Sequence, residues 1–171
     1  MNDKIRVRFI GREEYRSAMA LCWRVFCEFE SGIVGKDGME SFSRFINDDT
    51  LYTVFLNGGF PVIAAFDGDV MIGVAAVRSG PHLSLLFVEG CYQQMGVGTA
   101  LLDYFREWLL QTRSWLKGPT LTVNASSVGK GFYRKLGFKD TGPLSVKDGI
   151  EYTPMELLLR EQALSKKGYV S

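Results

Sequence analysis

The chain has 171 residues, of which 46% are hydrophobic and 23% charged, and its formal net charge is +1. These values predict one globular domain, residues 1–171, that can bury a sizeable core. A net charge near zero disfavours a nucleic-acid-binding protein, because the totals supply no broadly basic surface for phosphates. No apolar run approaches the roughly 20 residues that span a bilayer.

The cysteines and the histidine limit the chemistry further. Cys22, Cys27 and Cys91 have no metal-ligand spacing and leave one cysteine unpaired in any disulfide scheme. His82 is the only histidine, which disfavours a zinc site and a Ser-His-Asp triad. The N-terminus contains no apolar segment of the kind found in signal peptides. We therefore expect a cytoplasmic protein with no metal, no nucleic-acid partner and no membrane partner.

The first part of the chain predicts one strand followed by three helices. Residues 5–10 alternate apolar and basic side chains, which indicates a strand. Residues 13–29 carry apolar side chains at helical spacing. The glycine-rich residues 31–38 predict a loop, and two further helices are expected at residues 40–46 and 48–57.

Three strands follow and are expected to form an antiparallel meander. Residues 61–66 and 70–77 are apolar runs that flank Asp67-Gly68-Asp69, a sequence that favours a tight hairpin turn. Ser79-Gly80-Pro81 then turns the chain into a strand at residues 82–88.

Helices and strands alternate in the rest of the chain. An amphipathic helix begins near Gly96, and residues 120–123 form the next strand. The strand–helix–strand unit makes this strand parallel to residues 83–88, with a right-handed crossover. Residues 126–136 predict a short helix. The last strands are expected at residues 138–141, 145–146 and 150–159.

The segment Gln93-Gln94-Met95-Gly96-Val97-Gly98 lies between the end of the apolar run 83–88 and the amphipathic helix. Such a loop leaves several backbone N–H groups unpaired at a helix N-terminus. Their partial positive charge, with no side chains at the two glycines, favours binding of a phosphate or pyrophosphate. Neither a P-loop nor the three-glycine Rossmann pattern is present.

At these residues the chain resembles the GNAT N-acetyltransferase superfamily. Gln93-x-x-Gly96-x-Gly98 matches the family's acetyl-CoA signature, and it stands between the expected strand and helix. A second family segment follows, Leu121-Thr122-Val123-Asn124 and then Phe132-Tyr133-Arg134-Lys135-Leu136-Gly137-Phe138. Met95 departs from the pattern, because a basic residue is common there. The resemblance runs over residues 5–159.

The resemblance implies the fold and the cofactor. The expected fold is α/β, with a GNAT-like mixed, mostly antiparallel sheet of six to seven strands. Helices cover both faces, and the sheet splays apart between strands 82–88 and 120–124. The implied cosubstrate is acetyl-CoA, with its pyrophosphate on the loop amides and its pantetheine arm along a strand edge. The residues expected to bind it are Leu86, Phe87, Val88, Gln93, Gln94, Met95, Gly96, Val97, Gly98, Thr99, Asn124 and Phe132.

The implied reaction is direct attack of a primary amine, on a small molecule or peptide, on the acetyl thioester. Tyr133 resembles the family's general acid, with Phe132 beside it as the natural core contact. A backbone N–H near Phe87 or Val88 is expected to stabilise the oxyanion. Dimers are common among relatives, so a homodimer is possible.

Two points stay open at the level of the sequence. The general base is His82, Glu89 or a water molecule. Glu30, Asp37 and Glu40 fall where the family shapes its acceptor pocket; they attract a cationic amine or form a solvated loop face, and the solvated arrangement is expected. A non-catalytic acyl-CoA-binding module on the same scaffold is the alternative to an enzyme.

Overall fold

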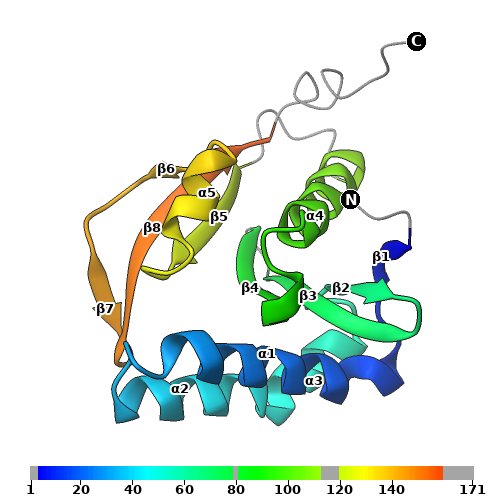
Figure 1. Cartoon of the computed structure of the whole chain (residues 1–171), viewed down its shortest axis with the longest axis horizontal. Coiled ribbons are helices and arrows are strands. Elements are labelled where there is room, and N and C mark those ends of the chain that lie inside the picture. The colour runs from blue at the N-terminus through cyan, green and yellow to red at the C-terminus, as the bar shows by residue number, and fades with distance from the viewer. Residues whose placement is uncertain (1–3, 79–80, 113–119, 160–171) are drawn as a thin grey trace.

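A computed structural model describes residues 4–78, 81–112 and 120–159 of the chain (Figure 1). The strands are β1 (Ile5–Phe9), β2 (Val62–Asp67), β3 (Val70–Arg78), β4 (His82–Val88), β5 (Thr120–Ala125), β6 (Lys139–Asp140), β7 (Ser145–Lys147) and β8 (Ile150–Leu158). The α-helices are α1 (Tyr15–Glu30), α2 (Lys36–Ile46), α3 (Asp49–Leu56), α4 (Val97–Thr112) and α5 (Lys130–Lys135).

The strands form a mixed sheet in the order β1-β2-β3-β4-β5-β8-β6, with β7 paired to β8 beside this path. Every described pair is antiparallel except β4–β5, so the meander and the parallel crossover are confirmed. The sheet has eight strands, one at each of the eight ranges predicted along the chain, where the resemblance implied six to seven. The additional strands are β6 and β7, which are short and pair separately with β8. Residues 79–80 of the predicted turn before β4 lie outside the described residues.

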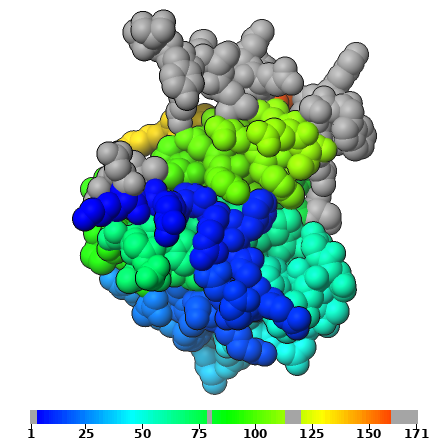
Figure 2. Space-filling model, turned by 90° about the vertical axis from the view of Figure 1, so that its right-hand side faces the viewer, coloured from blue at the N-terminus to red at the C-terminus, as the bar shows by residue number. Residues whose placement is uncertain are grey.

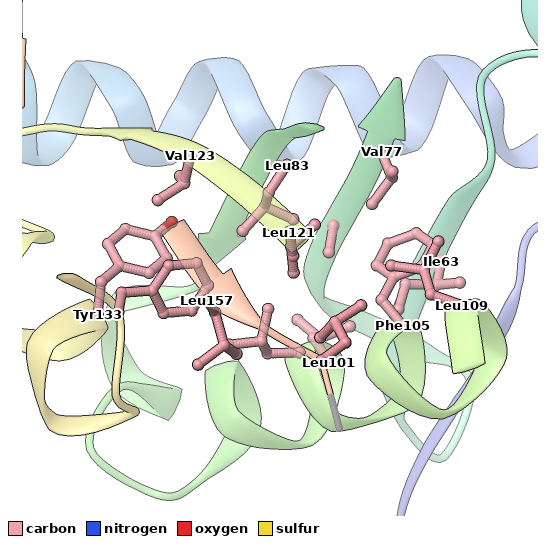
Figure 3. Close-up of a cluster of buried hydrophobic side chains, with 14 of the residues drawn as sticks. Ile63, Val77, Leu83, Leu101, Phe105, Leu109, Leu121, Val123, Tyr133 and Leu157 are labelled. Carbon is pink, nitrogen blue, oxygen red and sulfur yellow. The ribbon is translucent and has the colours of Figure 1, made fainter. Parts of the chain in front are cut away.

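Helices cover both faces of the sheet, as expected from the resemblance. α1 buries a stripe at helical spacing that includes Ala18, Cys22 and Phe26. On the opposite face α4 buries Leu101 and Phe105 in a second hydrophobic cluster (Figure 3). None of the described helices is both long and apolar enough to cross a membrane.

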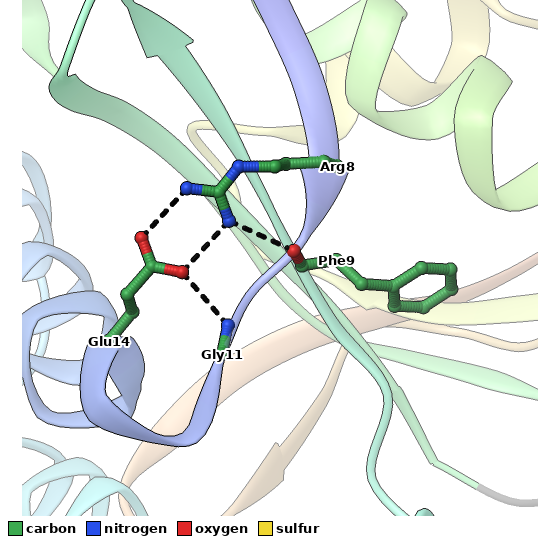
Figure 4. A network of polar contacts seen from close by, with 4 residues as sticks. All are labelled: Arg8, Phe9, Gly11 and Glu14. Atoms are coloured by element: carbon green, nitrogen blue, oxygen red, sulfur yellow. Dashed lines mark hydrogen bonds and ion pairs between the residues drawn. The ribbon is translucent and has the colours of Figure 1, made fainter.

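A polar network fixes the turn from β1 into α1 (Figure 4). The Glu14 carboxylate accepts hydrogen bonds from both terminal nitrogens of Arg8, at 2.8 and 2.9 Å, and from the Gly11 N–H at 2.8 Å. Arg8 also donates to the Phe9 carbonyl at 3.1 Å. The Arg8 hydrogen bond is the main reason that the pKa of Glu14 lies below its ordinary value. The start of α1 is thereby tied to the end of β1.

α2 begins at Lys36, earlier than the start predicted at residue 40. The sequence interpretation was wrong because Gly38 indicated a loop. In the structure Gly38 lies inside α2, where an added Cβ would stand 2.7 Å from the carbonyl oxygen of Gly149. Ser41 Oγ donates to the Asp148 carbonyl at 2.8 Å beside this contact. The glycine therefore serves a close approach between α2 and the β7–β8 turn.

α5 is shorter than the helix predicted over residues 126–136. It begins at Lys130, and residues 126–129 form a turn. The Ser126 hydroxyl oxygen accepts a hydrogen bond from the Gly129 N–H at 3.1 Å. A serine side chain that binds a nearby backbone N–H competes with helical bonding, which explains the late start.

The sheet splays apart where the resemblance implies it. β4 and β5 pair at two positions, His82 with Thr122 and Leu83 with Val123. Beyond these positions β4 stays paired with β3 and β5 with β8, and the two strands diverge (Figure 1). We call the unpaired stretch, residues 84–88 of β4 and 124–125 of β5, the β4–β5 gap. It opens toward the end of β4, just before the glycine loop.

Candidate active site

The glycine loop presents a row of backbone donors. Gln94 and Gly96 take positive φ angles of 60° and 84°, and the first helical bond of α4 joins the Ala100 N–H to the Gly96 carbonyl at 2.9 Å. The N–H groups from Gln94 to Thr99 make no well-formed hydrogen bond to another described residue. An added Cβ at Gly96 would meet open space. The loop can therefore accommodate an anionic group on its main chain.

Gly98 brings three parts of the expected site together. A Cβ built there would lie 3.2 Å from Phe132 Cζ in α5 and 3.9 Å from Val88 Cγ2 at the end of β4. The loop, the end of β4 and the start of α5 therefore meet at one point. Phe132 was expected to be the core contact; it is half-buried and packs on both the loop and the edge of the hydrophobic cluster, whereas Tyr133 is 8% exposed inside that cluster and is the more deeply buried of the two rings.

A bulge decides which groups of β4 face the gap. Ala76 pairs with Leu85 and Val77 with Leu83, so Ser84 is an extra residue on β4. The Glu89 N–H donates to the Ile72 carbonyl at 2.9 Å. By the alternation of antiparallel pairs, the main-chain groups of residues 85 and 87 also face β3.

The main-chain groups of Leu86 and Val88 consequently face the β4–β5 gap. Gln93 Nε2 donates to the Val88 carbonyl at 3.0 Å. The open edge therefore consists of the Val88 N–H and the N–H and carbonyl of Leu86. The oxyanion donor was expected near Phe87 or Val88. The Phe87 N–H faces β3 and so does not open on the gap, whereas the Val88 N–H lies on the open edge beside the main-chain groups of Leu86. The pairing alternation after a bulge is not visible in a single sequence.

Tyr133 lies in the cluster on the α4 face and points its hydroxyl end toward Val123 (Figure 3). Its ring contacts the rings of Phe132 and Phe138, each with centroids 5.3 Å apart. Burial raises the pKa of Tyr133 well above its ordinary value. The hydroxyl therefore keeps its proton and can act as a donor beside the β4–β5 gap.

His82 lies at the closed end of the gap, on the opposite face. Its cross-strand partner Arg78 stacks its guanidinium 5.5 Å from the ring centroid of Phe45 in α2, which places both side chains on the α1–α2 face. His82 Nδ1 hydrogen-bonds Thr122 Oγ1 at 2.8 Å. Burial, followed by the charges of Arg78 and Lys147, lowers the pKa of His82. The imidazole is thus neutral at pH 7 and can accept a proton.

Glu89, the other residue considered as a base, forms an ion pair with Arg24 of α1. Arg24 Nε also donates to the same carboxylate oxygen at 3.1 Å. The Glu89 carboxylate is therefore already bound by a cation of α1, and this engagement favours His82 over Glu89 as the base.

Glu30 is a buried carboxylate that the sequence interpretation placed in solvent. It is 8% exposed at the end of α1, and burial raises its pKa, against the opposing effect of a hydrogen bond from Ser126. Ser126 stands at the turn before α5, so Glu30 borders the region of Tyr133. The sequence does contain a pattern that indicates this burial: Glu30 follows Cys22 and Phe26 at four-residue spacing, on the buried side of α1.

The remaining expected residues lie around the loop. Asn124 is exposed on β5 beyond the last β4–β5 pair, and Met95 is 48% exposed. Gln94 and Thr99 sit at the two ends of the row of free N–H groups, and Val97 is buried at the start of α4. Asp37 and Glu40 are exposed on α2, as expected.

Comparison with known families matches residues 31–159 to the model described as an acetyltransferase (GNAT) domain. The chain belongs to the GNAT acetyltransferase family. Among solved structures, a GCN5-related N-acetyltransferase from Rhodopseudomonas palustris superposes with a TM-score of 0.75 at 22% identity, covering 92% of this chain and 97% of that one. Comparison with curated proteins finds no match.

Two further acetyltransferase structures carry the coenzyme. The PaiA N-acetyltransferase from Thermoplasma acidophilum, solved with coenzyme A, has a TM-score of 0.70 at 21% identity over 90% of this chain and 98% of that one. YncA from Salmonella typhimurium, solved with acetyl-CoA, has a TM-score of 0.63 at 20% identity over 93% and 96%. At these identities the likeness shows the GNAT fold and not the substrate.

Proposed function

We propose that this GNAT-family chain is an acetyl-CoA-dependent N-acyltransferase that moves an acetyl group to a primary amine of a small molecule or peptide. The observation that carries the proposal is the β4–β5 gap, which has a proton donor, Tyr133, on one face and a neutral imidazole, His82, at its closed end on the other. The row of free amides at Gln94–Thr99 stands at its open end.

The residues fit the cosubstrate. The main-chain N–H groups of Gln94–Thr99 suit a pyrophosphate, and the coenzyme in two structural neighbours supports this assignment. The open edge of Leu86 and Val88 suits the amide groups of a pantetheine arm. From Val88 back to Ser84 the strand is about 13 Å long, at roughly 3.3 Å per residue, so an arm on this edge leads toward His82.

Bound acetyl-CoA would supply the acetyl thioester and, as the leaving group, the coenzyme thiolate. A lysine-like amine with a pKa near 10.4 must lose a proton before it attacks, at a cost of about 4.6 kcal/mol at pH 7. We assign the removal of that proton to His82, directly or through one water. Glu30, buried beside Ser126, offers a negative charge for an approaching ammonium group.

Tyr133 acts on the departing sulfur. Proton transfer from an ordinary tyrosine to a thiolate is uphill by about 2 kcal/mol, and burial of Tyr133 enlarges that difference. The hydroxyl therefore donates a hydrogen bond that stabilises the sulfur's developing charge. The Leu86 N–H, on the open edge of β4, is the matching donor for the carbonyl oxygen.

The test combines binding with turnover. Titration calorimetry with acetyl-CoA and free coenzyme A measures association, and thiol release over a panel of amines measures transfer. We expect saturable binding of both coenzyme forms and turnover with a subset of amines. Binding without turnover on any amine would favour the non-catalytic acyl-CoA-binding module. No binding at millimolar coenzyme would overturn the assignment of the loop.

A further inference from the structure

The closed end of the β4–β5 gap carries an arginine that is held in place without an anion. Arg78, the last residue of β3, donates from Nε to Ser84 Oγ at 2.9 Å. Its guanidinium also stacks on the ring of Phe45 in α2, 5.5 Å from the ring centroid. Ser84 is the first residue of β4 beyond the positions paired with β5. Two contacts therefore fix the guanidinium beside the start of the gap.

The two terminal nitrogens of Arg78 remain available. Within the described part of the chain they make no hydrogen bond and no ion pair. Arg78 is exposed, so a molecule in solution can reach these nitrogens. By contrast, the guanidinium groups of Arg8 and Arg24 are each paired with a carboxylate of the chain. The free edge of a guanidinium matches the two oxygens of a carboxylate.

A second cation acts at the same place. Lys147 of β7 is exposed and forms no ion pair with another described residue. Its charge and that of Arg78 both lower the pKa of His82. The turn after Lys147 is bound to α2 through the hydrogen bond from Ser41 to Asp148. We call Arg78, His82 and Lys147 the cationic corner, on the α1–α2 face of the sheet.

The charge along this face reverses toward the open end of the gap. Phe29 lies against the chain just after β4, because a Cβ added at Gly90 would stand 3.3 Å from Phe29 Cζ. Glu30 is hydrogen-bonded to Ser126, just after β5. The last turn of α1 therefore spans the open end and places a carboxylate there. A molecule with an ammonium group and an anionic group is attracted by both ends of the face.

We propose that the acceptor is a free α-amino acid whose carboxylate binds Arg78 in the cationic corner while its amine faces the gap. The inference rests on the proposed acetyl transfer and names its substrate class. His82 and Ser84 are two positions apart on β4, at most about 7 Å at roughly 3.3 Å per residue. An acceptor that contacts both the imidazole and the guanidinium must carry its amine and its anion a few bonds apart. An amino acid meets this condition, whereas the terminal amine of a peptide has no carboxylate beside it.

Matched acids and amides test the role of the carboxylate. The probes are the common L-amino acids, each compared with its α-carboxamide. Thiol release gives kcat/KM for transfer, and calorimetry against the coenzyme A complex measures acceptor binding without turnover. We expect at least one amino acid to bind and to be acetylated, with its amide bound at least about tenfold more weakly, the size of one charge-assisted hydrogen bond.

Variants of Arg78 locate the contact. Arg78→Gln should lower the ratio of kcat/KM for the acid to that for its amide by about tenfold or more. Acid and amide differ in amine basicity, but this difference is the same for both enzymes and cancels in the comparison. Arg78→Lys should restore part of the ratio, because the charge remains while the paired donor geometry is lost. Coenzyme affinity should not change in either variant.

The control is Arg6→Gln, at an exposed position of β1. β1 is the far edge strand of the sheet and lies on the face shown in Figure 2, so the ratio should stay unchanged. Acids that bind no more tightly than their amides, or a ratio that is unchanged in Arg78→Gln, would overturn the proposal even where transfer to amines is observed. Tighter binding of acids without any transfer would instead support the carboxylate site and contradict the proposed function.

Discussion

Burial removes water from the hydroxyl of Tyr133 and from the carboxylate of Glu30, and both groups hold their protons more tightly as a result. For Tyr133 this strengthens a role as hydrogen-bond donor. For Glu30 it makes the charged form costly unless a cation arrives. Each effect gives a measurable difference between the wild type and an isosteric variant.

Replacing Tyr133 by Phe removes the proposed donor and keeps the ring in the core. We expect kcat to fall by about 10²-fold or more, with acetyl-CoA affinity unchanged, because no proposed binding contact to the coenzyme is lost. Thiol release and calorimetry measure the two quantities. The control is Tyr104→Phe, which removes a hydroxyl from a residue of α4 whose ring packs against Phe9. Near-normal turnover would remove Tyr133 from the mechanism.

Glu30→Gln tests the buried charge through stability. The pKa of Glu30 is raised in the folded state, so the folded protein binds the proton more tightly than the unfolded chain does. Stability from this group is therefore full below the unfolded pKa of about 4.3 and is lost as the pH rises through the higher folded pKa. Glutamine does not titrate, so the variant keeps its stability as the pH rises. The melting temperature of Glu30→Gln minus that of wild type should therefore increase from pH 4 to pH 7.

The control for this comparison is Glu28→Gln, at an exposed position two residues earlier on α1. It makes the same replacement without removing a buried carboxylate. A melting temperature of Glu30→Gln that does not rise relative to wild type between pH 4 and pH 7 would show that the Glu30 carboxylate is solvated.

As the proposed base, His82 should set the acid limb of the pH profile of kcat/KM. Its pKa is lowered by burial and by Arg78 and Lys147, so the neutral imidazole persists below the ordinary value of about 6.5. The acid limb of kcat/KM in wild type should therefore fall below pH 6.5. His82→Gln should lower kcat/KM and abolish that limb; an unchanged profile would exclude His82 as the base.

At the scale of elements, the contact between α2 and the β7–β8 turn closes the helical layer against the C-terminal strands. Gly149 has a φ of +79°, and an added Cβ would lie 2.6 Å from the Gly38 nitrogen. Ser41 adds its hydrogen bond to Asp148. The contact therefore depends on two glycines far apart in the chain.

Gly149→Ala separates this close approach from backbone strain. Gly58 has a similar φ of +81° but open space around it, so Gly58→Ala measures the strain alone, about 1–2 kcal/mol. Gly149→Ala should cost about 1–3 kcal/mol more through overpacking. Chemical denaturation measures both. Equal losses in the two variants would show that the turn can move away from α2.

At the scale of the whole molecule, local pattern predicts most of the architecture. Alternation in β1, the Asp67-Gly68-Asp69 turn and the amphipathic stripe of α4 are properties of neighbouring residues, and each is confirmed. The misplaced start of α2 at Gly38 and the unforeseen bulge at Ser84 have related causes. Gly38 meets a turn that is distant in sequence, at Gly149, and the bulge depends on how β4 pairs with the neighbouring strand β3; neither pairing is visible in local sequence pattern.

The same limit applies to the candidate site. The motif around Gly96 and Gly98 indicates the loop, because donors at a helix start are local. The burial of Glu30, the ion pair of Glu89 and the opposite faces of His82 and Tyr133 require the assembled sheet. Side-chain roles are therefore less predictable than the position of the loop.

The two paired positions between β4 and β5 leave an interruption in the middle of the sheet. Amide protons of Leu86 and Val88 should consequently exchange with deuterium faster than those of Leu85 and Phe87, which bond to β3. A pantetheine arm laid on that edge would act as a temporary extra strand. Added coenzyme should then slow exchange at Leu86 and Val88 selectively, so the cosubstrate would complete the sheet that binds it.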